Sequence, residues 1–170
     1  MNNNVITGQR EACDKQTASI ACPDIMNMLK TSVICCLLDE RLTFLWGNTG
    51  FYNNIHDSEK DFCRDYHDLS QYYANFPEDF LMITQALALE QEKGRSDIEL
   101  TVRLPLKDNG FLWVNLCGTI QEQPQWNKPV LQIEFSNVSS LISEKEEQTR
   151  LYRQKLGYFK WMMDTYVGNV

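Results

Sequence analysis

The chain has 170 residues and a hydrophobic fraction of 43%, which suits a single domain with tails and one substantial core. Its formal net charge is −7, and no basic stripe is available to neutralise phosphates, so nucleic acids and anionic membranes are disfavoured as partners. No segment reaches the ~18 apolar residues of a membrane span, and the N-terminus lacks the apolar stretch of a signal peptide. We therefore expect a cytoplasmic location.

The six cysteines show no C-x-x-C spacing, and Cys35 and Cys36 are adjacent inside an apolar run. Free thiols in such a run behave as small hydrophobes, so we predict reduced structural cysteines and no metal site. The chain also has no glycine-rich phosphate loop, no G-x-S-x-G elbow and no H-E-x-x-H motif. We therefore predict that it is not an enzyme and has no catalytic residues.

The N-terminal half reads as a leader, a hairpin and an irregular stretch. Residues 1–22 are polar and aperiodic, which predicts a loosely ordered leader. Residues 32–38 (SVICCLL) are short, β-branched and apolar, as in a buried strand, and residues 42–46 (LTFLW) follow a turn, which predicts a hairpin. Residues 47–76 break into short polar and aromatic pieces that are typical of loops and brief helices.

A helix and three strands follow. Pro77 and the two acidic residues after it begin a helix that we expect to end at Lys93. Residues 97–104 alternate strictly between apolar and polar, which predicts a half-buried strand. Residues 111–121 and 130–138, each preceded by a turn, are predicted to be its antiparallel continuation.

The chain ends in a predicted helix over residues 141–166, whose apolar residues step by four and three: Tyr152, Leu156, Phe159, Met163 and Tyr166. This spacing is that of a heptad seam. Continued backwards, the seam falls on Thr149 and Lys145, so it is polar in its first half. The alternative interpretation is an ordinary amphipathic helix packed on its own domain.

Four local motifs, in order, resemble those of the PAS family of sensory domains. Asn48 to Tyr52 (NTGFY) resembles the N-x-x-F segment, and Ser58 to Phe62 (SEKDF) resembles the S-x-E-E-L segment. Residues 109–114 (NGFLWV) resemble the D-G-x-x-W-V turn and strand, and residues 137–140 (NVSS) stand where D-I-T-E usually ends the last strand. The resemblance covers residues 24–140 and departs from the pattern at Asn137, which replaces an aspartate, and at His56-Asp57, which replaces Gly-Tyr.

The resemblance implies an α+β fold, a five-stranded antiparallel sheet with helices on one face and a long C-terminal exit helix. It implies a leader at 1–22, a PAS domain at 23–140, and a signalling helix at 141–170 that leads to an output domain outside this chain. Within the motifs, Asn48 is also explained by a turn, and Phe51 and Trp113 by the core.

PAS ligands lie between the sheet and its covering helices, so the resemblance implies a cleft lined by apolar residues from both: Leu37, Phe80, Ile83, Leu87, Leu100 and Leu116. A small organic ligand and a packed, empty core are both compatible with this lining. The helix over 77–93 contains no histidine, so we expect no haem. Residues 62–65 (FCRD) retain only the Cys-Arg pair of the flavin photosensor motif, so we expect no flavin and an ordinary thiol at Cys63.

These observations favour a non-catalytic sensory module that forms a homodimer through the seam at Tyr152, Leu156, Phe159 and Met163. The resemblance implies that it relays a signal to an output domain such as a diguanylate cyclase or histidine kinase. A different class of function is also compatible, namely a ligand-free dimerisation or protein-interaction module. The identity of the ligand, the signal and the output domain does not follow from the sequence.

Overall fold

The computed structural model describes residue 27, residues 31–124 and residues 126–167, with the backbone alone for residues 161 and 163–167. The predicted leader at 1–22 lies outside the described residues. The chain divides into two compact units, one up to Ser136 and one from Asn137, and each is described separately.

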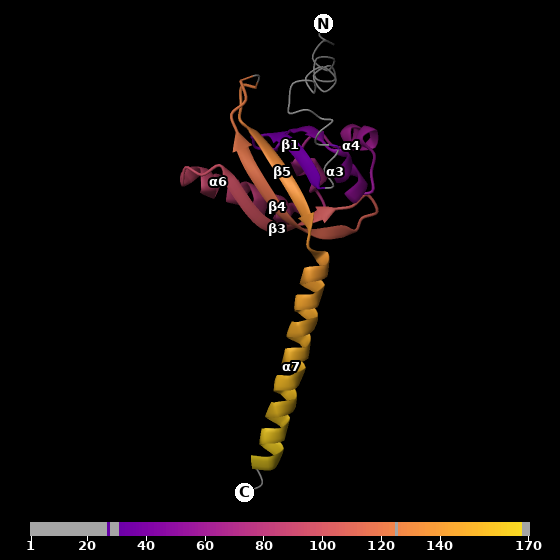
Figure 1. Ribbon diagram of the computed structural model, residues 1–170, viewed down its shortest axis with the longest axis vertical. Helices are drawn as coiled ribbons and strands as arrows, with labels where there is room; N and C mark the ends of the chain where they lie inside the picture. Colours follow the sequence, from indigo (N-terminus) through magenta and orange to yellow (C-terminus); the bar gives the residue numbers. More distant parts are fainter. Residues whose placement is uncertain (1–26, 28–30, 125, 168–170) are drawn as a thin grey trace. The chain divides into compact units, whose positions relative to one another are not determined.

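The first unit contains a five-stranded sheet with strand order β2-β1-β5-β4-β3, which confirms the predicted antiparallel architecture (Figure 1). Its strands are β1 (Ser32–Leu37), β2 (Phe44–Gly47), β3 (Asp97–Pro105), β4 (Phe111–Gln121) and β5 (Val130–Asn137). In the register, Ile34 of β1 faces Ile133 of β5, and Val102 of β3 faces Val114 of β4. Residues that are far apart in sequence therefore form one apolar sheet surface.

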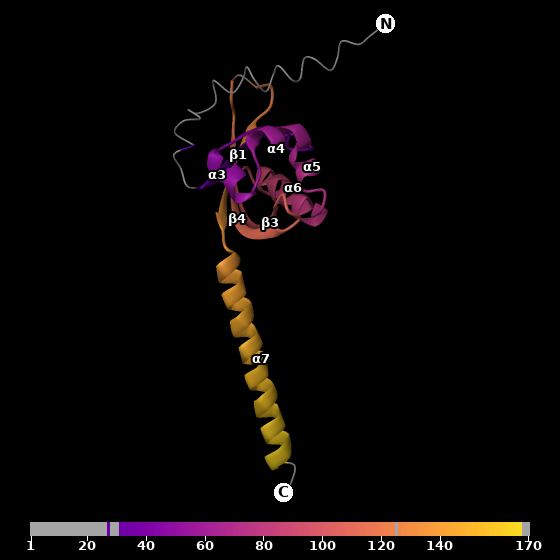
Figure 2. The ribbon, with the colours of Figure 1, turned by 90° about the vertical axis from the view of Figure 1, so that its right-hand side faces the viewer.

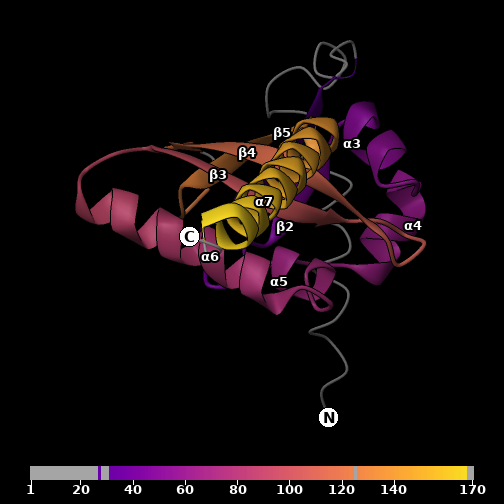
Figure 3. The same ribbon diagram turned by 90° about the horizontal axis from the view of Figure 1, so that it is seen from below.

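Helices cover one face of this sheet, as Figures 2 and 3 show from two directions. They are α3 (Thr49–Asn54), α4 (Glu59–Asp65), α5 (Leu69–Tyr72) and α6 (Pro77–Glu92). The core lies between the two layers and joins Ile34 and Cys36 of the sheet to Phe51, Phe62 and other helical side chains. Alternation along each strand explains why only every second side chain enters this core.

The hairpin loop between β1 and β2 is longer than predicted, because Leu42 is not in a strand. Asp39 accepts hydrogen bonds from the backbone nitrogen of Thr43 at 3.0 Å and from its hydroxyl at 2.7 Å. These bonds close a loop in which Leu42 adopts a left-handed φ of 54° and still buries its side chain. The strand pattern of residues 42–46 was therefore misleading at its first residue, since an apolar side chain can be buried from a loop.

Asn48 links β1 to α3. Its side chain accepts hydrogen bonds from the backbone nitrogens of Val33 and Phe51, each at 2.9 Å, and donates one to the carbonyl of Thr31 at 2.8 Å. It thus caps the N-terminus of α3 while it holds the start of β1. Gly50 is required beside it, because a Cβ there would lie 2.6 Å from the carbonyl oxygen of Thr31.

At the turn His56-Asp57, histidine stands where the family usually has glycine. His56 has a φ of 60°, the left-handed conformation that glycine adopts most easily. The carboxylate of Asp57 is paired with the ammonium of Lys107, whose backbone nitrogen donates to the carbonyl of Ile55 at 3.1 Å. These contacts fix the α3–α4 turn to the β3–β4 turn.

The second unit is the helix α7 (Ser139–Val167), two residues longer at its start than predicted. The side-chain oxygen of Asn137 accepts a hydrogen bond from the backbone nitrogen of Ser139 at 3.0 Å, and the nitrogen of Ile142 donates to the carbonyl of Val138 at 3.1 Å. Asn137 therefore starts the helix without the charge of the usual aspartate. With 29 residues, α7 is ~43 Å long.

Candidate functional site

The helix α5 positions two adjacent tyrosines in the core. The side chain of Asp68 caps α5 by accepting from the backbone nitrogen of Gln71 at 2.9 Å. The backbone nitrogen of Tyr73 donates to the carbonyl of Leu69 at 2.9 Å, so the single turn of helix continues up to Tyr73. Both Tyr72 and Tyr73 are buried as a result.

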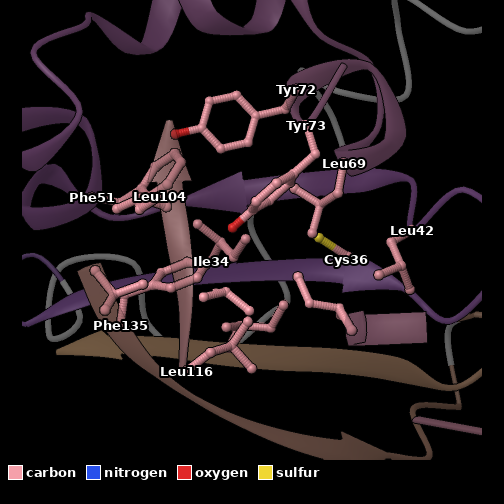
Figure 4. Close-up of a cluster of buried hydrophobic side chains, with 14 of the residues drawn as sticks. Ile34, Cys36, Leu42, Phe51, Leu69, Tyr72, Tyr73, Leu104, Leu116 and Phe135 are labelled. Carbon is pink, nitrogen blue, oxygen red and sulfur yellow. The ribbon is translucent and has the colours of Figure 1, made fainter. Parts of the chain in front are cut away.

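The two tyrosine hydroxyls have different environments. The hydroxyl of Tyr72 donates to the carbonyl of Pro105 at 2.5 Å. Among the residues that the structure describes, the hydroxyl of Tyr73 has no hydrogen-bond partner, although its side chain is fully buried. Figure 4 shows the Tyr73 ring passing Leu69, with its hydroxyl directed into the cluster. Burial raises the pKa of Tyr73 well above its ordinary range, so this hydroxyl is neutral and can donate a hydrogen bond.

Five of the six residues predicted to line a cleft lie at the interface between sheet and helices. Ile83, Leu87 and Leu116 are in the buried cluster, and Phe80 and Leu100 pack against it while partly exposed. Leu37 differs, because strand alternation places it on the same side as Val33 and Cys35, away from Ile34 and Cys36. The residue pattern of an apolar strand gave no sign of which face is inward.

Trp113 lies on the other side of the sheet. It faces Arg103 across the β3–β4 pair, and its ring lies 5.7 Å from that of Phe111. The core interpretation is therefore correct for Phe51, which is fully buried, and wrong for Trp113, which is half-buried outside the main cluster.

An aromatic cluster, which the sequence pattern did not predict, forms part of the core. Rings from α3, α4 and α5 contact one another at centroid distances of 5.1 to 6.2 Å, among them Phe51, Phe62 and Tyr72. The available signal was the spacing of Leu69, Tyr72 and Tyr73, which is that of one face of a helix. That face is only one turn long, and it was hidden in a stretch that looked irregular.

Cys63 on α4 is half-buried and faces Tyr52. Burial, and then the proximity of Cys63, raise the pKa of Tyr52 well above its ordinary range. Among the residues that the structure describes, no three metal-ligating side chains gather at one place. Within the same residues, no helix is both long and apolar enough to cross a bilayer.

The predicted seam residues of α7 are exposed. Tyr152 is 63% exposed, Leu156 50% and Phe159 57%. The backbone is helical at Met163, whose side chain is outside the described residues. A shallow hollow on α7 is lined by residues of this helix alone, so it is a surface groove and not a ligand cleft. Its lining residues are Ile142, Lys145, Glu146, Thr149, Arg150, Arg153 and Gln154.

No protein-family model matches the chain, and no curated protein is significantly similar to it in sequence. Solved structures do resemble it. An RNA-binding Light-Oxygen-Voltage receptor is 8% identical with a TM-score of 0.61, covering 94% of this chain and 41% of the receptor. The PAS domain of a protein from Colwellia psychrerythraea is 13% identical with a TM-score of 0.54, covering 80% and 99%.

A sensory box histidine kinase/response regulator from Burkholderia thailandensis is 12% identical, with a TM-score of 0.52, and covers 76% of this chain and 92% of that one. Identities at this level establish the fold alone. The fold that these similarities indicate agrees with the strand order, the helices on one face of the sheet and the packed layer between sheet and helices. This chain therefore has the fold of a PAS domain.

Proposed function

We propose that the chain is a non-catalytic sensory module that relays a signal through a dimeric C-terminal helix to an output domain such as a diguanylate cyclase or a histidine kinase. The observation that carries this proposal is the exposed apolar seam on α7, at Tyr152, Leu156 and Phe159. The helix directly follows β5, the last strand of a fold that occurs in sensor kinases such as the Burkholderia protein.

The energetics favour a modest dimer. Each large apolar side chain gains about 1.5–3 kcal/mol on full burial, and these three are about half exposed. Pairing two copies would bury six such side chains, which gives roughly 5–9 kcal/mol before Met163 and Tyr166 are added. Association itself costs about 4–15 kcal/mol. The gain and the cost are of similar size, so we expect a weak, concentration-dependent dimer whose helices are not locked in one arrangement.

The first half of the seam supports a relay role. Lys145 occupies an inward heptad position, and the hydroxyl of Thr149 bonds to the carbonyl of Lys145 in its own helix at 2.8 Å. Polar residues at such positions weaken the packing locally. A change in the PAS core can then bias the register or rotation of the paired helices while the apolar half keeps the dimer together.

The sensing site that we propose is the sheet–helix interface around Tyr73. A buried hydroxyl without a partner is unfavourable by about 1–3 kcal/mol, so a ligand with a hydrogen-bond acceptor would relieve that cost. Other members of the same buried cluster, including Ile83, Leu87 and Leu116, are apolar. We therefore propose a small, mainly apolar organic ligand with one acceptor, and neither haem nor flavin.

The alternative is a module that binds no ligand and serves only for dimerisation or protein interaction. Mass spectrometry of the purified protein after denaturation distinguishes the ligand-binding sensor from the ligand-free module. The sensor should release about one small molecule per protein chain. The Tyr73→Phe variant is the matched control and should release less of it. Recovery of no small molecule from the native protein, purified from several growth conditions, would favour the alternative.

We place the module in the cytoplasm, with its own copy and an output domain as partners, and without nucleic acid or membrane. The net charge of −7 supports this assignment. Because one structural neighbour is an RNA-binding receptor, RNA is the nucleic acid to test for binding. Titration with single-stranded RNA at ~0.15 M salt should give no saturable binding, and a specific complex under those conditions would overturn this part of the proposal.

A further inference from the structure

Cys63 and Tyr52 lie at the contact between α4 and α3, which Figures 1 and 3 show side by side. The ring of Tyr52 lies 5.9 Å from that of Phe62, the residue before Cys63. Tyr52 is 6% exposed, whereas Cys63 is half-buried and packs against the same core. Cys63 is therefore the side of this contact that a small solute can reach.

The hydroxyl of Tyr52 is directed at this contact. Within the described part of the chain, its buried oxygen has no partner at a hydrogen-bonding distance and angle. Burial, and then the nearby sulfur of Cys63, raise the pKa of Tyr52 well above its ordinary range, so the hydroxyl stays neutral and keeps its proton. Gly47 lies on another side of the hydroxyl, because a Cβ there would be 3.3 Å from the same oxygen. Tyr52 is thus a buried donor beside a sulfur atom.

The other cysteines that the structure describes have different surroundings. Cys35 and Cys36 are 2% and 0% exposed, so a solute does not reach their sulfurs. Cys117 is exposed, but partial burial and then Glu99 and Glu134 raise its pKa, which keeps the thiol protonated. The thiolate is the reactive form, so Cys117 should react slowly. The sequence alone predicts an ordinary thiol at Cys63, and the contact with the tyrosine is what distinguishes it.

We propose that Cys63 is a site of oxidation by hydrogen peroxide to a sulfenic acid, with the Tyr52 hydroxyl as hydrogen-bond donor to the added oxygen. The thiolate sulfur attacks the peroxide, an S–O bond forms as the O–O bond breaks, and the departing hydroxide takes up the proton of the thiol to become water. Sulfur loses two electrons, which the peroxide gains. The new oxygen supplies the acceptor that the buried hydroxyl lacks.

Oxidation at Cys63 would act on the aromatic core without a bound ligand. The ring of Phe62, the preceding residue, lies 5.3 Å from that of Phe51 and 5.1 Å from that of Tyr72. An oxygen added at Cys63 is therefore accommodated where α4 packs on this cluster. Glu59 also contributes to the raised pKa of Tyr52, and a nearby carboxylate disfavours a thiolate, so we expect the reaction to need an excess of peroxide.

Trapping with dimedone tests the proposal, because dimedone reacts with sulfenic acids and leaves thiols unmodified. The full chain is treated with excess hydrogen peroxide in the presence of dimedone, and peptide mass spectrometry measures the labelling of each cysteine. We expect Cys63 to be labelled about fivefold faster than Cys117, although Cys117 is the more exposed of the two. Labelling of Cys117 at an equal or higher rate would overturn the proposal.

The Tyr52→Phe variant tests the role of the hydroxyl. It removes a single oxygen that has no partner among the described residues, so the reduced protein should keep the urea midpoint of the parent or exceed it. We expect dimedone labelling of Cys63 to fall about fivefold while that of Cys117 is unchanged. Alkylation of the reduced Cys63 by iodoacetamide, which reports access to the thiol, should stay within about twofold. Unchanged dimedone labelling of Cys63, or an equal loss of alkylation, would overturn the proposal.

Discussion

The carboxylate of Asp79 holds the edge strand β3 through Arg103. It accepts from the backbone nitrogen of Arg103 at 3.0 Å and from its Nε at 2.7 Å. Asp79 is 3% exposed and lies in the first turn of α6, whose N-cap residue, Phe76, makes no capping bond with its side chain. One carboxylate therefore stabilises the start of α6 and satisfies a donor on the open edge of the sheet.

We expect Asp79→Ala to lower the free energy of unfolding by about 1–3 kcal/mol, because it leaves two partly buried donors of Arg103, its backbone nitrogen and its Nε, without an acceptor. Urea denaturation measures this change. Glu78→Ala is the matched control, since Glu78 contacts the same guanidinium from an exposed position, and its midpoint should stay close to that of the parent. Equal losses in the two variants would contradict the role of Asp79.

Phenylalanine substitutions at the two neighbouring tyrosines should change the free energy of unfolding in opposite directions. Tyr72→Phe should destabilise the protein by about 1 kcal/mol, because it removes the donor to the carbonyl of Pro105. Tyr73→Phe should stabilise the ligand-free protein by about 1 kcal/mol, because it removes a buried hydroxyl that has no partner. Thermal unfolding of both variants in parallel measures these changes in stability. A destabilised Tyr73→Phe variant would show that the Tyr73 hydroxyl has an acceptor in solution.

Stability should fall at low pH. Burial raises the pKa of Asp39, but hydrogen bonds from Thr43 and Arg41 outweigh it and lower that pKa below 3.8. A lowered folded-state pKa adds stability above the unfolded value, and that stability is lost as the pH falls through the folded value. We therefore expect the urea midpoint to decline below about pH 4.5. An unchanged midpoint between pH 6 and pH 3 would contradict it.

At high pH, the stability of the folded state should fall as the pH rises. Burial raises the pKa of the Cys35 thiol from 9.0 to about 12. A raised folded-state pKa adds stability that is complete below the unfolded value and is lost as the pH rises through the folded value. We expect unfolding to become easier between pH 9 and pH 12, with Cys35→Ala less sensitive over that range. Equal sensitivity of parent and variant would assign the loss to other groups.

The purified protein should show neither a haem Soret band nor flavin absorption. The helix α6 contains no histidine, and α4 retains only Cys63 and Arg64 of the flavin motif. The measurement is the near-ultraviolet and visible absorption spectrum of freshly purified protein, in which both chromophores would be seen. A chromophore near one equivalent would contradict the ligand class proposed above, whereas a colourless ligand agrees with it.

Long elements with strong periodicity could be predicted from the sequence. The alternation in residues 97–104 gave both the strand and its inward face, since Ile98, Val102 and Leu104 are buried as expected. The helix begins at Pro77, as predicted from proline and acids at its start. These signals are local, so a single chain is enough to read them.

The short helices could not be predicted in the same way. The helices α3, α4 and α5 have six, seven and four residues, too few for a periodic pattern. Each exists because a side chain caps it, namely Asn48, Ser58 and Asp68, and because its aromatic residues pack on a sheet built from distant sequence. The unpaired hydroxyl of Tyr73 follows from that packing, so no sequence pattern reports it.

The most direct test of the proposed relay is the mass of the Leu156→Glu/Phe159→Glu variant in solution. Burying unpaired carboxylates at the seam is costly, so light scattering at ~10 µM should show the parent as a dimer and the variant as a monomer, with the strand signal in circular dichroism retained. Gln154→Glu/Gly157→Glu, outside the seam on the same helix, is the control and should remain dimeric. A dimeric Leu156→Glu/Phe159→Glu variant at that concentration would contradict the relay through α7.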